Sequence, residues 1–143
     1  MPYRLLEANR EAVMVGLGRG ESVRTVPARV TRIAELAPGA LAVADGLRGI
    51  TYEQLEKRSN QIARLLIEVG VGAESVVALL FGRGVDFVVS ALAVMKAGGA
   101  YLPLDASNPR ARLQAIIDDA MPVVVLTDKA HREAAEHKRV SDL

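Results

Sequence analysis

The run SVVALLFGRGVDFVVSALAVMKAGGAYLPLD, residues 75–105, decides the fold of this chain. It opens with a continuous apolar stretch rich in Val and Leu, which is typical of a β-strand covered on both faces. After the turn FGRG, the apolar residues of Val85 to Ala97 recur at helical spacing, and Gly98-Gly99 closes that segment. Ala100 to Leu102 then predict a second strand. A strand, a helix and another strand in this order predict a βαβ unit and therefore a parallel sheet.

The same alternation extends to the N-terminal side of this run. Residues 41–45 (LAVAD) and Ile50 to Tyr52 predict a small hairpin. Thr51 is expected to cap a long helix, with Gln54 completing a capping box and Gly70 ending the helix. The residues expected to form the buried stripe of this helix are Leu55, Ile62, Leu65, Leu66 and Val69.

The alternation also extends to the C-terminal side. Pro103 is expected to end the hydrogen bonding of its strand because proline has no N–H to donate. Asn108 as N-cap and Pro109 at the first helical position predict another helix, with Leu113, Ile116 and Ile117 facing inward. PVVVLTD, residues 122–128, predicts a further buried strand.

These patterns predict an α/β fold, a parallel sheet with βαβ crossovers, preceded by a helical arm. The arm comprises residues 1–39, with helices expected at residues 3–16 and 26–37, the second carrying Pro27 in its first turn. Residues 40–143 form the α/β part. The final segment, KAHREAAEHKRVSDL, is polar and shows only a weak apolar stripe.

Composition excludes several classes of function. The formal net charge is +1 and aromatic residues make up 3% of the chain, so neither nucleic acid nor an anionic membrane surface is expected as a partner. The chain has no cysteine, which excludes disulfides and thiolate chemistry. No apolar run is long enough to span a membrane. We therefore expect a cytoplasmic domain.

The glycine-rich stretches are weak candidates for nucleotide sites. Gly16, Gly18 and Gly20 lack the spacing of a dinucleotide fingerprint and follow a predicted helix, which favours a connector. FGRGVD, residues 81–86, lies between a strand and a helix, but it lacks the end of a P-loop, so a tight turn is favoured over an anion site. In KAGGAYLPLD the helix precedes the glycines, which presents the carbonyl end of a helix and disfavours anions.

A few other polar residues remain. Lys96, in the last turn of its helix, is explained by the helix dipole alone. Asp105 follows the carboxyl end of a strand, where α/β proteins bind ligands, and is the one residue retained as a candidate. His131 and His137 are six apart, which favours two solvated histidines over a shared metal site.

The adjacent carboxylates Asp118 and Asp119 do not face one substrate, because neighbouring residues on a helix point in different directions. No serine has the context of a nucleophile elbow. The serines considered are Ser59, Ser75, Ser90 and Ser107.

Two motifs carry a resemblance to a known family. ITYEQL (50–55) and MKAGGAYLPLD (95–105) resemble the first two core motifs of amino-acid adenylation domains of nonribosomal peptide synthetases, in the acyl-adenylate-forming (AMP-binding) superfamily. The separation of the motifs and the segments around them are also similar, so the resemblance covers nearly the whole chain. Ala106 and Asn108, where the family often has proline and an aromatic residue, depart from its pattern. The residues that match the motifs are Thr51, Tyr52, Leu55, Lys96, Ala97, Gly98, Tyr101, Pro103 and Asp105.

The resemblance implies the N-terminal subdomain of the adenylate-forming fold, ending before the phosphate loop. A complete enzyme of this family uses ATP and Mg²⁺ to convert an amino acid into an aminoacyl adenylate, and then loads a carrier-protein thiol. The two motifs retained here are chiefly structural in the family. The resemblance therefore assigns no catalytic, cofactor-binding or metal-binding residue to this chain.

Three interpretations follow. The chain is the N-terminal portion of an adenylation enzyme that requires a downstream part or a partner chain, or it is a noncatalytic scaffold in a peptide-synthetase pathway, or it is an unrelated flavodoxin-like domain. If the sheet stops at Val123 to Thr127, it leaves an unpaired edge or an uncovered apolar face. We therefore expect the chain to form a homo-oligomer or to pair with a complementing peptide-synthetase chain.

Overall fold

The computed structural model describes residues 25–46, 48–132 and 140–142. The chain divides into two compact units, residues 1–58 and 59–143, each of which is considered by itself. The predicted helix over residues 3–16 and the glycines of residues 16–20 lie outside the described residues. The predicted boundary after residue 39 stays a prediction about the sequence, whereas the division into compact units falls inside a helix, after Arg58.

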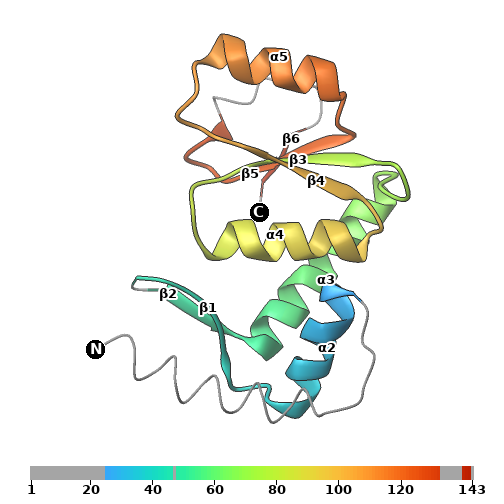
Figure 1. The fold of residues 1–143 in the computed structure, drawn as a ribbon, viewed down its shortest axis with the longest axis vertical. Coiled ribbons are helices and arrows are strands. Elements are labelled where there is room, and N and C mark those ends of the chain that lie inside the picture. The colour runs from blue at the N-terminus through green and yellow to red at the C-terminus, as the bar shows by residue number, and fades with distance from the viewer. Residues whose placement is uncertain (1–24, 47, 133–139, 143) are drawn as a thin grey trace. The chain divides into compact units, whose positions relative to one another are not determined.

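The described part of the first unit begins with a helix and a hairpin, both of which the sequence predicts. Helix α2, Val26–Leu36, begins after Thr25, whose Oγ1 accepts a 3.4 Å hydrogen bond from the N–H of Ala28. Strands β1, Leu41–Asp45, and β2, Arg48–Thr51, pair in antiparallel fashion (Figure 1).

Helix α3, Tyr52–Glu68, starts with the predicted capping box. The N–H of Thr51 donates to Oε1 of Gln54 at 2.9 Å, and the N–H of Gln54 donates to Oγ1 of Thr51 at 3.3 Å. This reciprocal pair satisfies two backbone donors at the start of the helix. Burial raises the pKa of the neighbouring Tyr52 phenol.

The predicted buried stripe of α3 is partly wrong. Leu55, Ile62 and Leu66 are buried, but Leu65 is 58% exposed and Val69 43% exposed. At about 100° per residue the buried positions lie on one side of the helix and Leu65 lies roughly 80° away from it. The position that completes the buried stripe is Ser59, whose exposure is 0%.

The second unit is a four-stranded sheet with the order β4-β3-β5-β6, in which all neighbouring pairs are parallel. Helices α4 and α5 connect successive strands and lie on opposite faces of the sheet (Figure 1). This arrangement confirms the predicted α/β fold. Its elements are β3 Val76–Leu80, α4 Val85–Lys96, β4 Ala100–Leu104, α5 Arg110–Ala120, β5 Val124–Thr127 and β6 Val140–Asp142.

Strand β3 lies between two strands and is covered on both faces. Residues 77–80 of this strand have 0% exposure. On one face, Ala78 and Leu80 belong to a core cluster with Leu113 and Ile117 of α5. Because side chains alternate along a strand, Val77 and Leu79 face the opposite side, where α4 lies.

The two glycines after α4 are required for different reasons. Gly98 has φ +84°, a left-handed conformation that residues with a Cβ rarely adopt. At Gly99 an added Cβ would lie 3.0 Å from Cγ1 of Val71 and 3.2 Å from the carbonyl oxygen of Ser75. Gly98 therefore turns the chain, and Gly99 lets β4 begin close to the residues before β3.

Two predictions near β4 and α5 are wrong. Strand β4 continues through Pro103 to Leu104, in register with β3. Proline is tolerated there because β4 lies at the edge of the described sheet, where no described strand pairs with its outer side. Helix α5 starts one residue later than predicted: Pro109 has a non-helical ψ of 142° and is the N-cap, and its carbonyl oxygen accepts a 3.1 Å hydrogen bond from the N–H of Leu113.

The expectation of an unpaired edge at Val123 to Thr127 is also wrong. Strand β5 pairs with β3 on one side and with β6 on the other. The outer strands of the described sheet are β4 and β6.

Substitutions at Gly98 test its role in the turn. Gly98→Ala should lower the free energy of unfolding by about 1–2 kcal/mol, because the left-handed conformation places its Cβ near a carbonyl oxygen. Gly98→Asn should cost clearly less, since asparagine tolerates this conformation. Urea unfolding followed by circular dichroism measures both.

Gly72→Ala provides the control. An added Cβ at Gly72 meets no atom within 4 Å, and its φ lies outside the left-handed range, so the substitution should leave stability unchanged or slightly increased. Equal losses for Gly98→Ala, Gly98→Asn and Gly72→Ala would contradict the assigned role of Gly98.

Candidate functional site

The carboxyl ends of β3 and β4 open onto a cavity of about 700 Å³. Its walls come from the loop that follows β3, the first turn of α4 and the loop that follows β4. This is the position at which parallel α/β sheets bind ligands. The lining residues are Phe81, Gly82, Arg83, Gly84, Phe87, Val88, Pro103, Leu104, Asp105, Ala106 and Ser107.

Asp105 provides a fixed negative charge at this cavity. Its Oδ1 accepts a 2.9 Å hydrogen bond from the backbone N–H of Ser107. Hydrogen bonds from the side chain and then from the backbone of Ser107 lower the pKa of the Asp105 carboxyl, and the nearby Arg83 lowers it further. The structure thus places the one candidate from the sequence in a cavity, as an ionised carboxylate at neutral pH.

Arg83 provides the opposite charge. It is exposed in the loop after β3, next to Gly84, which is the N-cap of α4. Gly84 has φ 152° and ψ −163°, and no side chain caps this end of the helix. The FGRG segment is thus the tight strand-to-helix turn that the sequence favoured.

The apolar wall of the cavity includes the aromatic ring of Phe87, which a second ring holds in place. Phe87 meets Tyr101 edge to face, with the ring planes at 90° and the ring centroids 6.2 Å apart. This geometry is favourable for aromatic pairs. Phe81, at the end of β3, is only 6% exposed and contributes a second ring.

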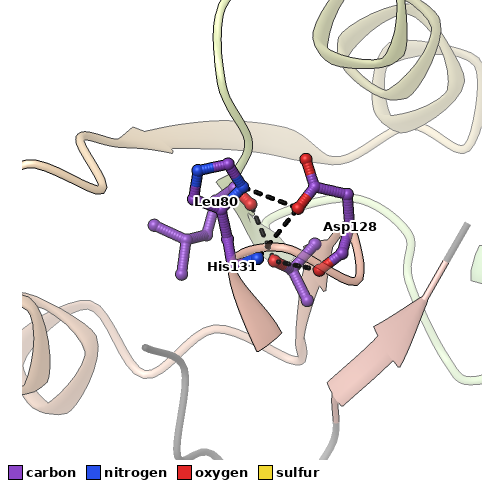
Figure 2. Close-up of polar contacts among 4 residues, drawn as sticks. Leu80, Asp128 and His131 are labelled. Atoms are coloured by element: carbon purple, nitrogen blue, oxygen red, sulfur yellow. Dashed lines mark hydrogen bonds and ion pairs between the residues drawn. The ribbon is translucent and has the colours of Figure 1, made fainter. Parts of the chain in front are cut away.

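A second polar cluster follows the carboxyl end of β5, on the same side of the sheet as the carboxyl ends of β3 and β4. Nδ1 of His131 lies 2.6 Å from Oδ1 of Asp128, and the N–H of His131 donates to the same oxygen at 2.9 Å (Figure 2). Thr127, which is fully buried, donates its hydroxyl to the carbonyl oxygen of Leu80 at 2.8 Å. These contacts connect the end of β5 to the end of β3.

This cluster corrects the sequence-based interpretation of His131 as a solvated residue. Its side chain is 28% exposed and pairs with Asp128, and its Cε1 would lie 3.7 Å from a Cβ placed on Gly82. The spacing Asp128-x-x-His131 within the turn after a strand was the signal available in the sequence. His137 lies outside the described residues.

Lys96 has a structural partner that the sequence did not reveal. Its Nζ donates a 2.7 Å hydrogen bond to Oδ1 of Asn60, which ties the last turn of α4 to α3. The order helix, glycines and strand is confirmed for the 95–105 motif. Only the end of this motif, from Pro103 to Asp105, reaches the cavity.

The other aspartate and serine candidates from the sequence do not form a common site. Asp118 accepts a hydrogen bond from Gln114 on the exposed side of α5, and Ser90 donates to the backbone of Asp86. Within residues 25–46 and 48–132, no three His, Asp or Glu side chains gather in a way that could hold a metal ion. No helix in the described part of the chain has the length and hydropathy needed to cross a membrane.

Comparison with known proteins gives a consistent assignment. The sequence profile of AMP-binding enzymes matches residues 30–143. Malpinin synthetase of Mortierella alpina is 46% identical over 110 residues, which cover 77% of this chain and 1% of that protein. Tyrocidine synthase 1 of Brevibacillus parabrevis is 40% identical over 97 residues, 68% of this chain and 9% of that protein. The chain thus spans a small part of these relatives.

Solved structures agree. The nonribosomal peptide synthetase FmoA3, in its α-methyl-L-serine-AMP bound form, superposes with a TM-score of 0.78 at 27% identity, covering 94% of this chain and 16% of that one. A fatty acid AMP ligase from Legionella pneumophila has a TM-score of 0.69 at 24% identity over 80% of this chain and 22% of that one, which supports the fold alone.

The Asp105–Ser107 turn predicts a measurable pKa difference. The pKa of Asp105 should lie below 3.8 in the folded chain, and Ser107→Ala should raise it by removing the largest cause of the shift. Because the folded pKa is depressed, the turn contributes stability above the unfolded pKa and loses it as the pH falls through the folded pKa. Carbon-detected NMR titration of the Asp105 carboxyl measures both values.

Ser75→Ala is the control for this titration, because Ser75 lies before β3, at the opposite end of the strands. It should leave the pKa of Asp105 unchanged. A wild-type pKa at or above 3.8, or no rise in the Ser107→Ala variant, would show that the turn does not hold the carboxylate.

Proposed function

This chain belongs to the family of AMP-binding enzymes, as the N-terminal part of an adenylation domain of the nonribosomal peptide synthetase type, and we propose that it serves ATP-dependent amino-acid activation. In this reaction a carboxylate oxygen of the amino acid attacks the α-phosphorus of ATP. A P–O bond of the triphosphate breaks, pyrophosphate leaves, and an aminoacyl adenylate forms. The observation that carries the proposal is the match over residues 30–143 together with the synthetase fold.

We propose further that this chain is not competent alone and works with a downstream part or a complementing chain. It corresponds to 16% of the matched FmoA3 chain. Its own two motifs form the capping box of α3 and the joint between α4 and β4, which are structural features. Its role in the reaction is to supply the sheet and the packing against which the rest of the domain folds.

ATP and Mg²⁺ are assigned to the remainder of the complete domain. Mg²⁺ prefers carboxylate and phosphate oxygens in octahedral geometry. Among the described residues no three carboxylate or imidazole groups converge, and we propose that the groups that hold this ion lie in the remainder of the domain.

We also propose a cytoplasmic location and a partnership with a second copy or another peptide-synthetase chain. The same observations support one alternative function, a noncatalytic scaffold in a peptide-synthetase pathway, because the motifs present here are structural. The two functions differ in whether a complementing chain restores adenylation.

Amino-acid-dependent exchange of pyrophosphate into ATP tests this proposal. The isolated chain should give background exchange with each of the standard amino acids. The chain fused to the polypeptide encoded directly downstream should give exchange with one or a few of them. The matched control is the downstream polypeptide without this chain, which should also stay at background.

Exchange above background by the isolated chain would contradict the proposed need for a partner. A fusion that folds but shows no exchange would favour the scaffold. Exchange by the downstream polypeptide alone would show that this chain is dispensable for the reaction.

A further inference from the structure

The cavity at the carboxyl ends of β3 and β4 has the size of a small-molecule site. Its volume of about 700 Å³ lies within the range of ligand pockets, which is roughly 300–1,000 Å³. Its walls come from two loops and one helix of the second unit, so it does not depend on the placement of the first unit.

The walls combine an apolar part with two opposite charges. Phe81, Phe87, Val88 and Leu104 supply rings and aliphatic groups. The ring of Phe87 is held by its contact with Tyr101, which lies outside the cavity lining. Such a surface favours a ligand with an apolar body.

Arg83 indicates an anionic group on the ligand. Among the residues that the structure describes, its guanidinium has no hydrogen bond or ion pair, and its interaction with Asp105 is the weakest of the effects on that carboxyl. A guanidinium offers five N–H donors, arranged to bind a carboxylate through two parallel bonds.

Asp105 indicates a cationic group. Its carboxylate is oriented by Ser107, and its lowered pKa keeps it ionised at neutral pH. The carboxylate therefore needs no reorganisation before it binds an ammonium group, which limits the cost of binding.

The loop after β3, which lines the cavity, is also held in place. The Thr127 hydroxyl binds the carbonyl oxygen of Leu80, and the ring of His131, held by Asp128, lies beside Gly82. These contacts restrain the loop that carries Arg83.

From the opposite charges and the apolar wall, we propose that this cavity binds a small zwitterion with an apolar body, its carboxylate at Arg83 and its ammonium at Asp105. A free amino acid with an aromatic side chain is the simplest such molecule. We propose it as a site separate from the adenylation reaction, and this separation rests on the proposed function, which assigns ATP and the reacting carboxylate to the remainder of the domain.

Binding of L-phenylalanine to the isotope-labelled chain, followed by amide chemical shifts, tests the proposal. Saturable shifts should appear at residues 81–88 and 103–107. Three probes each lack one feature: 2-phenylethylamine has no carboxylate, 3-phenylpropanoate has no ammonium, and glycine has no apolar body. Each should bind at least about tenfold more weakly, because each loses one charge-assisted contact or the apolar contact.

Arg83→Gln and Asp105→Asn should each weaken L-phenylalanine binding by about tenfold or more. The matched controls are Arg112→Gln and Asp119→Asn, exposed positions of α5 outside the cavity, which should bind like the wild type. Unchanged spectra away from the cavity would show that the variants fold.

Three outcomes would overturn the proposal: no saturable shift at the cavity, equal binding of the single-charge probes, or equal binding by the Arg83 and Asp105 variants. The measurement uses no ATP, so its result is independent of the pyrophosphate exchange assay.

Discussion

The burial of β3 is the constraint on which the second unit depends. Residues 77–80 have 0% exposure, with parallel strands on both sides and helices on both faces. A strand in this position must be apolar throughout, because both of its faces lie in the core. Its amino end fixes the close approach of Gly99 to Ser75, and its carboxyl end carries the loop that contains Arg83. The glycine turn between α4 and β4 therefore lies at the amino end of this buried strand, and the cavity lies at its carboxyl end.

The fold was largely predictable because it depends on local signals. The apolar run of β3, the glycines after α4 and the Thr51–Gln54 capping box each act within a few residues. The errors concern features set by distant neighbours. The tolerance of Pro103 depends on β4 being an edge strand, which sequence order does not specify. The pairing of β5 on its second side depends on β6, a three-residue strand in a segment with little apolar patterning.

The candidate site was less predictable. Asp105 could be selected because it follows a strand, but its orientation by Ser107 and its proximity to Arg83 depend on how two loops meet. The Asp128–His131 pair is a local contact within one turn, and the spacing to His137, which suggests only a metal site, does not reveal it. Lys96 was explained by the helix dipole alone, whereas its partner Asn60 lies 36 residues away in the sequence. Packing, and not periodicity, determines the contacts of Asp105 and Lys96.

Hydrogen–deuterium exchange of the backbone amides tests the central role of β3 most directly. The amides of residues 77–80 should be the slowest to exchange among the described strands and should exchange only through global unfolding, with the same denaturant dependence. The strand β4 should exchange faster, since it pairs with only one of the described strands. If the amides of β3 exchange as fast as those of β4, or exchange without global unfolding, β3 is not the strand on which this structure depends.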